Sequence, residues 1–169
     1  MIRSLDLGCG PNPKNIFDAH EVYGVDIRAN PNQNVVCADL AVEPIPFPDE
    51  YFDYVTAHDF IEHIPRLLYV PQRRYAFVEL MNEIWRVLKF NGVFMSLTPA
   101  YPHEQAWRDP THVNMITETT WQLYFDDQNR WGRDYGFIGA FRITQHEWRG
   151  PHLLAMMQKT MPVDSQSAG

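Results

Sequence analysis

The stretch "LDLGCGPNP", from Leu5 to Pro13, decides the fold. An apolar run, Ile2–Leu7, ends there, and the chain breaks directly into a glycine turn that contains two prolines. The run is typical of a buried strand, and glycine lets the backbone approach a ligand closely. Ligands of open α/β sheets bind at the carboxyl ends of the strands, so this turn predicts a binding site at the end of the first strand.

The two prolines narrow the kind of ligand. Pro13 stands where a G-x-G-x-x-G dinucleotide motif has its third glycine, and neither Pro11 nor Pro13 has a backbone N–H. A pyrophosphate is held by several such N–H groups and by a helix N-terminus. The turn therefore favours a positively charged ligand that contains an adenosine but no phosphate. It disfavours a nicotinamide-dependent oxidoreductase.

Further strands and one long helix follow along the chain. Residues 75–88 carry apolar side chains at positions 77, 80, 81, 84 and 88, the spacing of one helix face, and Asn91-Gly92 is expected to end this helix. Short apolar runs predict strands over Glu21–Asp26, Asn34–Ala38, Phe52–Ala57 and Gly92–Leu97. This pattern indicates an α/β fold with a largely parallel sheet.

The rest of the chain, from residue 98 onward, predicts a loop, a short helix and a hairpin. Residues 98–116 are rich in proline and aromatic side chains and are expected to form a long functional loop. The Trp and Tyr side chains of residues 101–124 can belong either to the core or to a substrate wall. Thr117 is expected to cap a helix that runs to residue 124 or 125. Two runs, Phe141–Trp148 and His152–Lys159, predict an antiparallel hairpin. We expect a single domain over residues 1–160 and a flexible tail over 161–169.

Composition excludes several classes of function. With 169 residues, 45% of them hydrophobic, the chain suits one domain with a sizeable core. Its net charge is −7, and residues 1–62 hold 11 acids against Arg3, Lys14 and Arg28, which disfavours nucleic acid and agrees with a cationic ligand. No apolar run reaches the roughly 18 residues of a membrane span. No secretory signal is expected, and two cysteines make no disulfide framework, so we expect a cytoplasmic protein.

Five segments of the sequence together resemble a known family. They are "LDLGCGPNP", "YGVDI", "VCADL", "FDYVTAHDFIEHI" and "VLKFNGVFMSLTP". Their order and spacing are similar to the successive motifs of class I S-adenosylmethionine-dependent methyltransferases, and most similar to the small type 11-like group with an "E-H-I/L" segment after the fourth strand. The resemblance implies a Rossmann-like sheet of seven strands, mostly parallel, with the last strand antiparallel. It also implies S-adenosylmethionine as cofactor and methyl transfer to an acceptor, which the acidic charge suggests is a small molecule.

The resemblance also assigns cofactor-binding residues, position by position. In chain order they are Asp6, Gly8, Gly10, Asp26, Ile27, Asp39, Leu40 and His58. The two glycines would approach the amino-acid part of the cofactor. Asp26 would bind the ribose hydroxyls, Ile27 would pack on the adenine, and Asp39 would reach the adenine amino group. His58 would line the methionine end.

Two departures from the family pattern affect how the site closes. The helix that usually precedes the first strand is expected to be missing, and the first crossover helix is expected to be reduced to a loop. Closure over the substrate is therefore expected from residues 65–75 and 99–116. The same departures keep open the alternative of a non-catalytic cofactor-binding or regulatory module.

Three side chains are candidates for the base that a hydroxyl or amine acceptor would need. His112 lies in "RDPTHV", in the loop after the fifth expected strand, where Asp109 could orient its ring. Asp59 follows the fourth expected strand, and His103 shares the loop with His112.

Other polar side chains receive a structural interpretation. Glu62 and His63 are adjacent and could form a catalytic pair, but the expected role of His63 is to support the turn. Histidines occur at positions 58 and 63 and at 103 and 112, and neither spacing matches a recognised ligand pattern, so no metal is expected. Cys9 is expected to be a small buried residue inside the turn rather than a reactive thiol.

Overall fold

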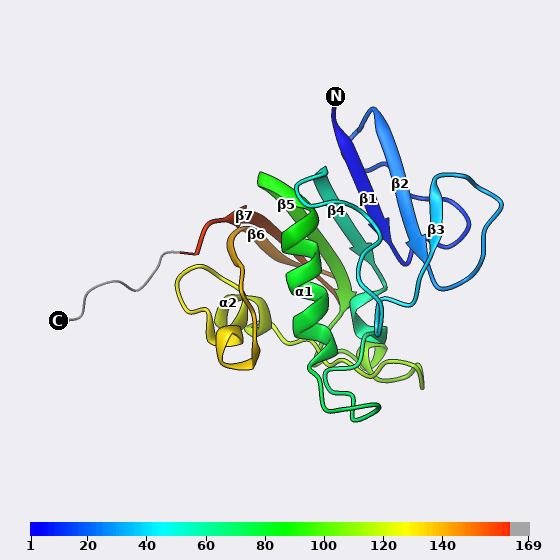
Figure 1. The fold of residues 1–169 in the computed structure, drawn as a ribbon. Coiled ribbons are helices and arrows are strands. Elements are labelled where there is room, and N and C mark those ends of the chain that lie inside the picture. Colours follow the sequence, from blue (N-terminus) through cyan, green and yellow to red (C-terminus); the bar gives the residue numbers. More distant parts are fainter. Residues whose placement is uncertain (163–169) are drawn as a thin grey trace.

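The computed structural model describes residues 1–162, which are built around one seven-stranded sheet (Figure 1). Its strands are β1 (Arg3–Leu7), β2 (Glu21–Asp26), β3 (Val35–Cys37), β4 (Phe52–His58), β5 (Leu88–Pro99), β6 (Ala140–Arg149) and β7 (His152–Thr160). Their order across the sheet is β3-β2-β1-β4-β5-β7-β6. Most of the expected tail, residues 163–169, lies outside the described residues.

Strand direction divides the sheet into two parts. The strands from β3 to β5 pair in parallel, whereas β7 pairs antiparallel with both β5 and β6. β6 and β7 form the expected hairpin, because Arg149 pairs with His152 across a turn at Gly150-Pro151. The predicted α/β, Rossmann-like and mostly parallel sheet with a C-terminal antiparallel hairpin is therefore confirmed.

The helix before β5 ends earlier than the sequence suggested. α1 (Ala76–Val87) is followed directly by β5, which begins at Leu88, so Asn91-Gly92 does not end the helix. The register between β4 and β5 shifts from the pair Phe52 and Leu88 to the pair Tyr54 and Val93. Asn91, with a φ of 61°, and Gly92 therefore lie in the irregular part of a strand.

The short helices lie in the loops at the ends of the strands. They are η1 (Ile61–His63), η2 (Glu104–Ala106), α2 (Thr120–Tyr124) and η3 (Trp131–Tyr135). The expected cap of α2 is wrong, since its N-cap is Thr119 and not Thr117. The N–H of Thr117 instead donates to the Thr120 hydroxyl at 3.0 Å, which closes the turn before the helix.

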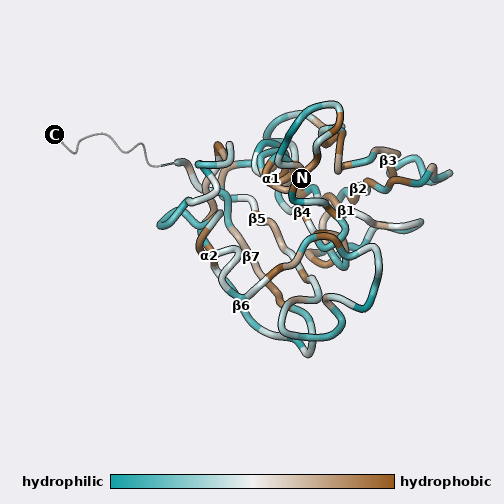
Figure 2. The backbone as a smooth tube through the Cα atoms, turned by 90° about the horizontal axis from the view of Figure 1, so that it is seen from below, coloured by the Kyte–Doolittle hydropathy of each residue, from teal (hydrophilic) through white to brown (hydrophobic). Residues whose placement is uncertain are grey.

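The core lies between the sheet and α1, which covers one face of it (Figure 1). Apolar side chains recur on one side of α1 at helical spacing, and Leu80, Met81, Ile84 and Val87 among them are buried. Figure 2 shows brown, apolar stretches along several strands, whereas many of the loops around them are teal. No helix within residues 1–162 is long and apolar enough to span a membrane.

The carboxyl edge of the sheet is the part of the fold that holds the candidate site. Residues 8–20, which connect β1 with β2, contain no helix, as expected. The loop after β5 is anchored to η1, because the N–H groups of Val113 and Asn114 donate to the Glu62 carbonyl at 2.8 and 2.9 Å. Arg66 donates to the Asn114 side chain and to the Met115 carbonyl, so the two segments expected to close the site contact each other.

Candidate functional site

Asp6, in β1, fixes the turn that follows this strand. This carboxylate is 2% exposed, and it accepts the Thr56 hydroxyl at 2.7 Å and the Lys14 N–H at 2.9 Å. Asp6 was expected near the cofactor, but the structure places it beneath the loop, where it ties β1 to β4 and fixes the start of the crossover. It acts as a positioning residue for the turn.

The two glycines of the turn have the same backbone conformation but different surroundings. Gly8 has a φ of 64° and Gly10 a φ of 62°, a region that favours glycine. A Cβ built on Gly8 would collide with the Phe60 ring, since it would lie 2.9 Å from Cγ and nearer still to Cδ2. A Cβ built on Gly10 would lie 3.8 Å from the nearest atom, Nη2 of Arg28. Gly10 therefore faces open space, whereas Gly8 allows Phe60 to pack against the turn.

Asp26 ends β2 next to this open space. Its side chain is 6% exposed, and its Oδ2 accepts the Gly10 N–H at 2.8 Å. Its Oδ1 accepts the N–H and the Nε–H of Arg28, both at 3.0 Å. Burial disfavours the charged form, but the bonds from Arg28 and Gly10 outweigh it and hold the pKa of Asp26 below its usual range. The carboxylate is thus ionised and directed at the turn.

A pocket of about 440 Å³ opens between the turn and the residues after β2. Gly10, Pro11, Asn12, Asp26, Arg28, Ala29, Asn30, Pro31 and Asn32 line it. The Arg28 side chain is 75% exposed, so it covers the Asp26 carboxylate without being held by the core. The Asn30 side chain donates to the carbonyls of Gly10 and Pro11 at 3.2 and 3.1 Å, so it joins the segment after β2 to the turn after β1.

The lining of this pocket does not include the other expected cofactor residues, Ile27, Asp39, Leu40 and His58, which differ in their exposure. Ile27 follows Asp26 and is 64% exposed, so its apolar surface is free to pack on a ligand. Asp39 is half-buried and accepts the Ala41 N–H at 3.0 Å, and Leu40 is buried and lines a different pocket, beside α1. His58 is half-buried, and its burial lowers the pKa of its imidazole.

Cys9 lies inside the turn, as expected. A Cβ on Gly24 would collide with its sulfur, which shows that the thiol fills the space above β2. Burial raises the pKa of Cys9 to about 11, so the thiol stays protonated at neutral pH. Cys9 and Cys37 are both free thiols.

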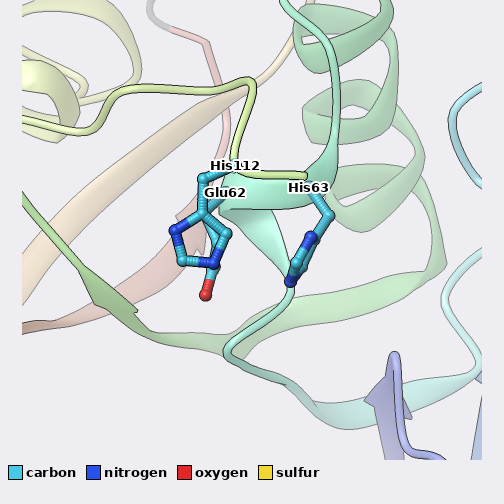
Figure 3. A group of neighbouring side chains, drawn as sticks. All are labelled: Glu62, His63 and His112. Carbon is cyan, nitrogen blue, oxygen red and sulfur yellow. The ribbon is translucent and has the colours of Figure 1, made fainter. Parts of the chain in front are cut away.

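The candidate bases separate into three groups at the carboxyl edge. Asp59 follows β4 with a φ of 46°, and its Oδ1 lies 2.8 Å from Nε2 of His152, the first residue of β7. His103 packs edge-on against the Trp148 ring, with centroids 5.1 Å apart. His112 belongs to a third group, with Glu62 and His63 (Figure 3). Asp109, expected to orient His112, instead accepts the Thr111 hydroxyl that contacts His63.

Several of these side chains were missed by sequence reasoning. Arg28 and Asn30 follow a strand end that was assigned to ribose binding, so their position along the chain was a usable signal. The position of His152 along the chain gave no such signal. This residue reaches the edge where β4 ends because β7 runs antiparallel to β5 and therefore begins there.

A family model described as a methyltransferase domain matches residues 5–96, more than half of the chain. The chain belongs to this methyltransferase family. The match extends from β1 into β5 and so includes every residue of the expected cofactor site, from Asp6 to His58. Membership confirms the resemblance read from the sequence and, with it, S-adenosylmethionine as the cofactor of this methyltransferase domain.

Solved structures of low sequence identity share the fold of the methyltransferase domain. The 1,6-didemethyltoxoflavin-N1-methyltransferase of Burkholderia thailandensis has a TM-score of 0.63 at 14% identity, over 94% of this chain and 71% of that chain. A SAM-dependent methyltransferase from Archaeoglobus fulgidus has a TM-score of 0.59 at 19% identity, over 94% and 86%. The [4+2]-cyclase SpnF has a TM-score of 0.57 at 15% identity, over 96% and 75%. Among curated protein sequences, none matches this chain.

The residues of the pocket fit this cofactor. The open space above Gly10 would be filled by a Cβ, so the glycine keeps room for a ligand beside the Asp26 carboxylate. A carboxylate at the end of the second strand can accept hydrogen bonds from ribose hydroxyls. Arg28 would have to swing away from Oδ1, which its exposure permits.

Proposed function

We propose that this protein transfers a methyl group from S-adenosylmethionine to a small-molecule acceptor. The observation that supports this best is Asp26, a buried carboxylate that is bonded to the Gly10 N–H and forms a wall of the 440 Å³ pocket. When bound, the cofactor supplies an activated methyl group on a sulfonium, so the protein mainly has to position the acceptor in line with it.

A second cavity supports a small acceptor. It has a volume of about 560 Å³ and is lined mostly by apolar and aromatic side chains, among them Tyr75, Phe77, Tyr124 and Phe125. Arg66 and Met115 also line it, and they come from the two segments expected to close the site. The first turn of α1 lies on the side of the carboxyl edge, because α1 connects the parallel strands β4 and β5. A cavity of this size and lining suits an apolar or aromatic small molecule.

Asp59 is the base that the geometry favours, with His152 behind it. His152 and Asp59 share a hydrogen bond of 2.8 Å, and the Asp59 side chain is 65% exposed at the edge where an acceptor would arrive. A carboxylate oriented by the imidazole can take a proton from a hydroxyl or amine, which leaves the carboxyl group neutral and the acceptor ready to attack the methyl group. His103 and His112 lie on the same edge and are the other candidates.

Replacing Asp26 by alanine is expected to weaken S-adenosylhomocysteine binding by about 1–3 kcal/mol, through loss of charge-assisted hydrogen bonds to the ribose. Calorimetric titration measures this, with NAD as a ligand that should not bind. Arg28→Gln is the matched control, because it removes the guanidinium over the same carboxylate and should leave the affinity within about threefold. Equal affinities in wild type and a folded Asp26→Ala variant would refute the ribose assignment.

Replacing Asp59 by asparagine is expected to lower turnover by about 10²-fold with little change in cofactor affinity, since the amide cannot accept the proton. Asparagine tolerates the positive φ of this position, so the backbone should be kept. Formation of S-adenosylhomocysteine, followed over a panel of small aromatic acceptors, gives the rate. If the variant keeps wild-type turnover, Asp59 is not the base. Variants of His103 and His112 are then measured in the same way.

A non-catalytic cofactor-binding module is the alternative. The fold also occurs in a protein named as a [4+2]-cyclase, so the fold is compatible with a role other than methyl transfer. Such a module would bind S-adenosylhomocysteine in calorimetry and respond to Asp26→Ala, but it would release no S-adenosylhomocysteine from S-adenosylmethionine with any acceptor of the panel.

A further inference from the structure

Three side chains with metal-ligating atoms meet at the carboxyl edge (Figure 3). Glu62 and His63 belong to η1, and His112 belongs to the loop after η2. One ligand atom of each lies within 4.8 Å of the other two, and Figure 3 shows the side chains projecting to the same side. The two imidazole rings lie edge to face, with centroids 4.9 Å apart.

The Glu62 carboxylate lacks one partner. Its side chain is 1% exposed, and Oε2 accepts the Thr98 hydroxyl at 2.6 Å. Its other oxygen, Oε1, is buried and has no hydrogen-bond partner among the described residues. A buried carboxylate oxygen without a partner is costly, and a cation beside it would supply the missing interaction.

Both imidazoles are oriented with one nitrogen free. Nδ1 of His112 lies 3.3 Å from the Ala106 carbonyl, which can only accept, so Nδ1 carries the proton. Nδ1 of His63 lies 3.1 Å from the Thr111 hydroxyl, and that hydroxyl donates its own proton to Asp109 at 2.7 Å. His63 must therefore donate from Nδ1 as well. Each Nε2 is left with a lone pair, the arrangement that outer hydrogen bonds impose on metal-binding histidines.

The backbone holds the two segments together. The N–H groups of Val113 and Asn114 donate to the Glu62 carbonyl, and the Asn114 side chain donates to the Ile61 carbonyl at 3.1 Å. His112 is thereby fixed opposite η1 by three hydrogen bonds to neighbouring residues. The cluster does not depend on long flexible side chains to come together.

We propose that Glu62, His63 and His112 bind one divalent transition-metal ion. Two imidazoles and one carboxylate suit ions such as Zn²⁺, Co²⁺ or Fe²⁺, and three protein ligands leave coordination positions open. His63 is exposed and gives the ion a path from solvent. Atoms bound to one ion at about 2.1 Å lie at most about 4.2 Å apart, so binding draws the ligands together by a small rotation of the exposed His63.

Titration of the metal-free protein with Co²⁺ tests the site without any cofactor or acceptor, so its outcome is independent of methyl transfer. Wild type should bind one equivalent and develop a visible absorption band, which Zn²⁺ should displace. Glu62→Gln and His112→Gln should each weaken Co²⁺ binding by at least about 100-fold, and Thr111→Val, which removes only the partner of His63, by about 10-fold. His20→Gln is the matched control, because this histidine accepts the Ile2 N–H at the opposite edge of the sheet.

Circular dichroism of each variant before the titration separates loss of binding from loss of folding. If Glu62→Gln does not fold, His112→Gln and Thr111→Val still test the site, because those side chains are not in the core. The proposal is overturned if wild type binds no Co²⁺ at millimolar concentration. It is equally overturned if all the variants bind as tightly as wild type, since the ion would then occupy another part of the surface.

Discussion

Replacing Gly10 by valine is expected to weaken S-adenosylmethionine binding by at least about 10³-fold, or about 4 kcal/mol. The nearest atom to a Cβ at this position belongs to Arg28, which lines the same pocket, so the new side chain would project into the space beside Asp26. A ligand could reach the Asp26 carboxylate only by displacing the valine. Calorimetric titration with S-adenosylhomocysteine, together with a thermal melt, measures the two effects separately.

Gly8→Ala is the matched comparison for this prediction. Gly8 and Gly10 have nearly the same φ, so a side chain at either pays a similar backbone cost of about 1–2 kcal/mol. At Gly8 the added atom also meets the Phe60 ring, so we expect the larger loss of thermal stability there. The resemblance places Gly8 at the amino-acid part of the cofactor, so from the sequence a side chain at this position is expected to block the ligand and to leave the fold largely intact. The contact with Phe60 adds an expected cost to the fold, and a Gly8→Ala variant as stable as wild type would contradict this prediction.

The sheet and its binding edge were predictable because local signals determine them. Apolar runs that end at Leu7 and Asp26 mark two parallel strands, and the glycines after the first run mark the edge. The surroundings of each glycine were not predictable, because Phe60 reaches Gly8 from beyond β4. Sequence spacing shows which residues share a strand or a turn. It does not show which side chains pack together when they come from segments that are distant along the chain.

The histidine cluster shows the same limit. The expectation of no metal rested on spacings between histidines, and His63 and His112 are 49 positions apart. Their proximity follows from the backbone bonds between residues 113–114 and η1, which no pattern within either segment reveals. The boundary at Asn91-Gly92 failed for a related reason: a turn-like dipeptide was accommodated as an irregularity where β5 pairs with β4.

Trp121→Ala is expected to lower the free energy of unfolding by about 3–5 kcal/mol. Trp121 in α2 is 0% exposed, and its ring lies 5.9 Å from the Phe77 ring of α1 and 6.3 Å from the Phe94 ring of β5, measured between centroids. Truncation would leave a cavity where three elements meet. From the sequence, the aromatic side chains of this region could belong to the core or to a substrate wall. The structure assigns Trp121 to the core, whereas Trp107 is 61% exposed.

The matched control, Trp121→Phe, distinguishes lost packing from a lost hydrogen bond. The indole N–H of Trp121 is buried and has no partner within residues 1–162, so phenylalanine removes volume but breaks no bond. We expect it to cost only about 1–2 kcal/mol, since most of the cavity stays filled. Urea denaturation gives both values, and cofactor affinity per folded molecule should stay unchanged because the Asp26 pocket contains no part of α2. An alanine variant as stable as the phenylalanine variant would show that the surrounding rings move into the space left by the indole. Packing of Trp121 would then not be what fixes α2 on the sheet.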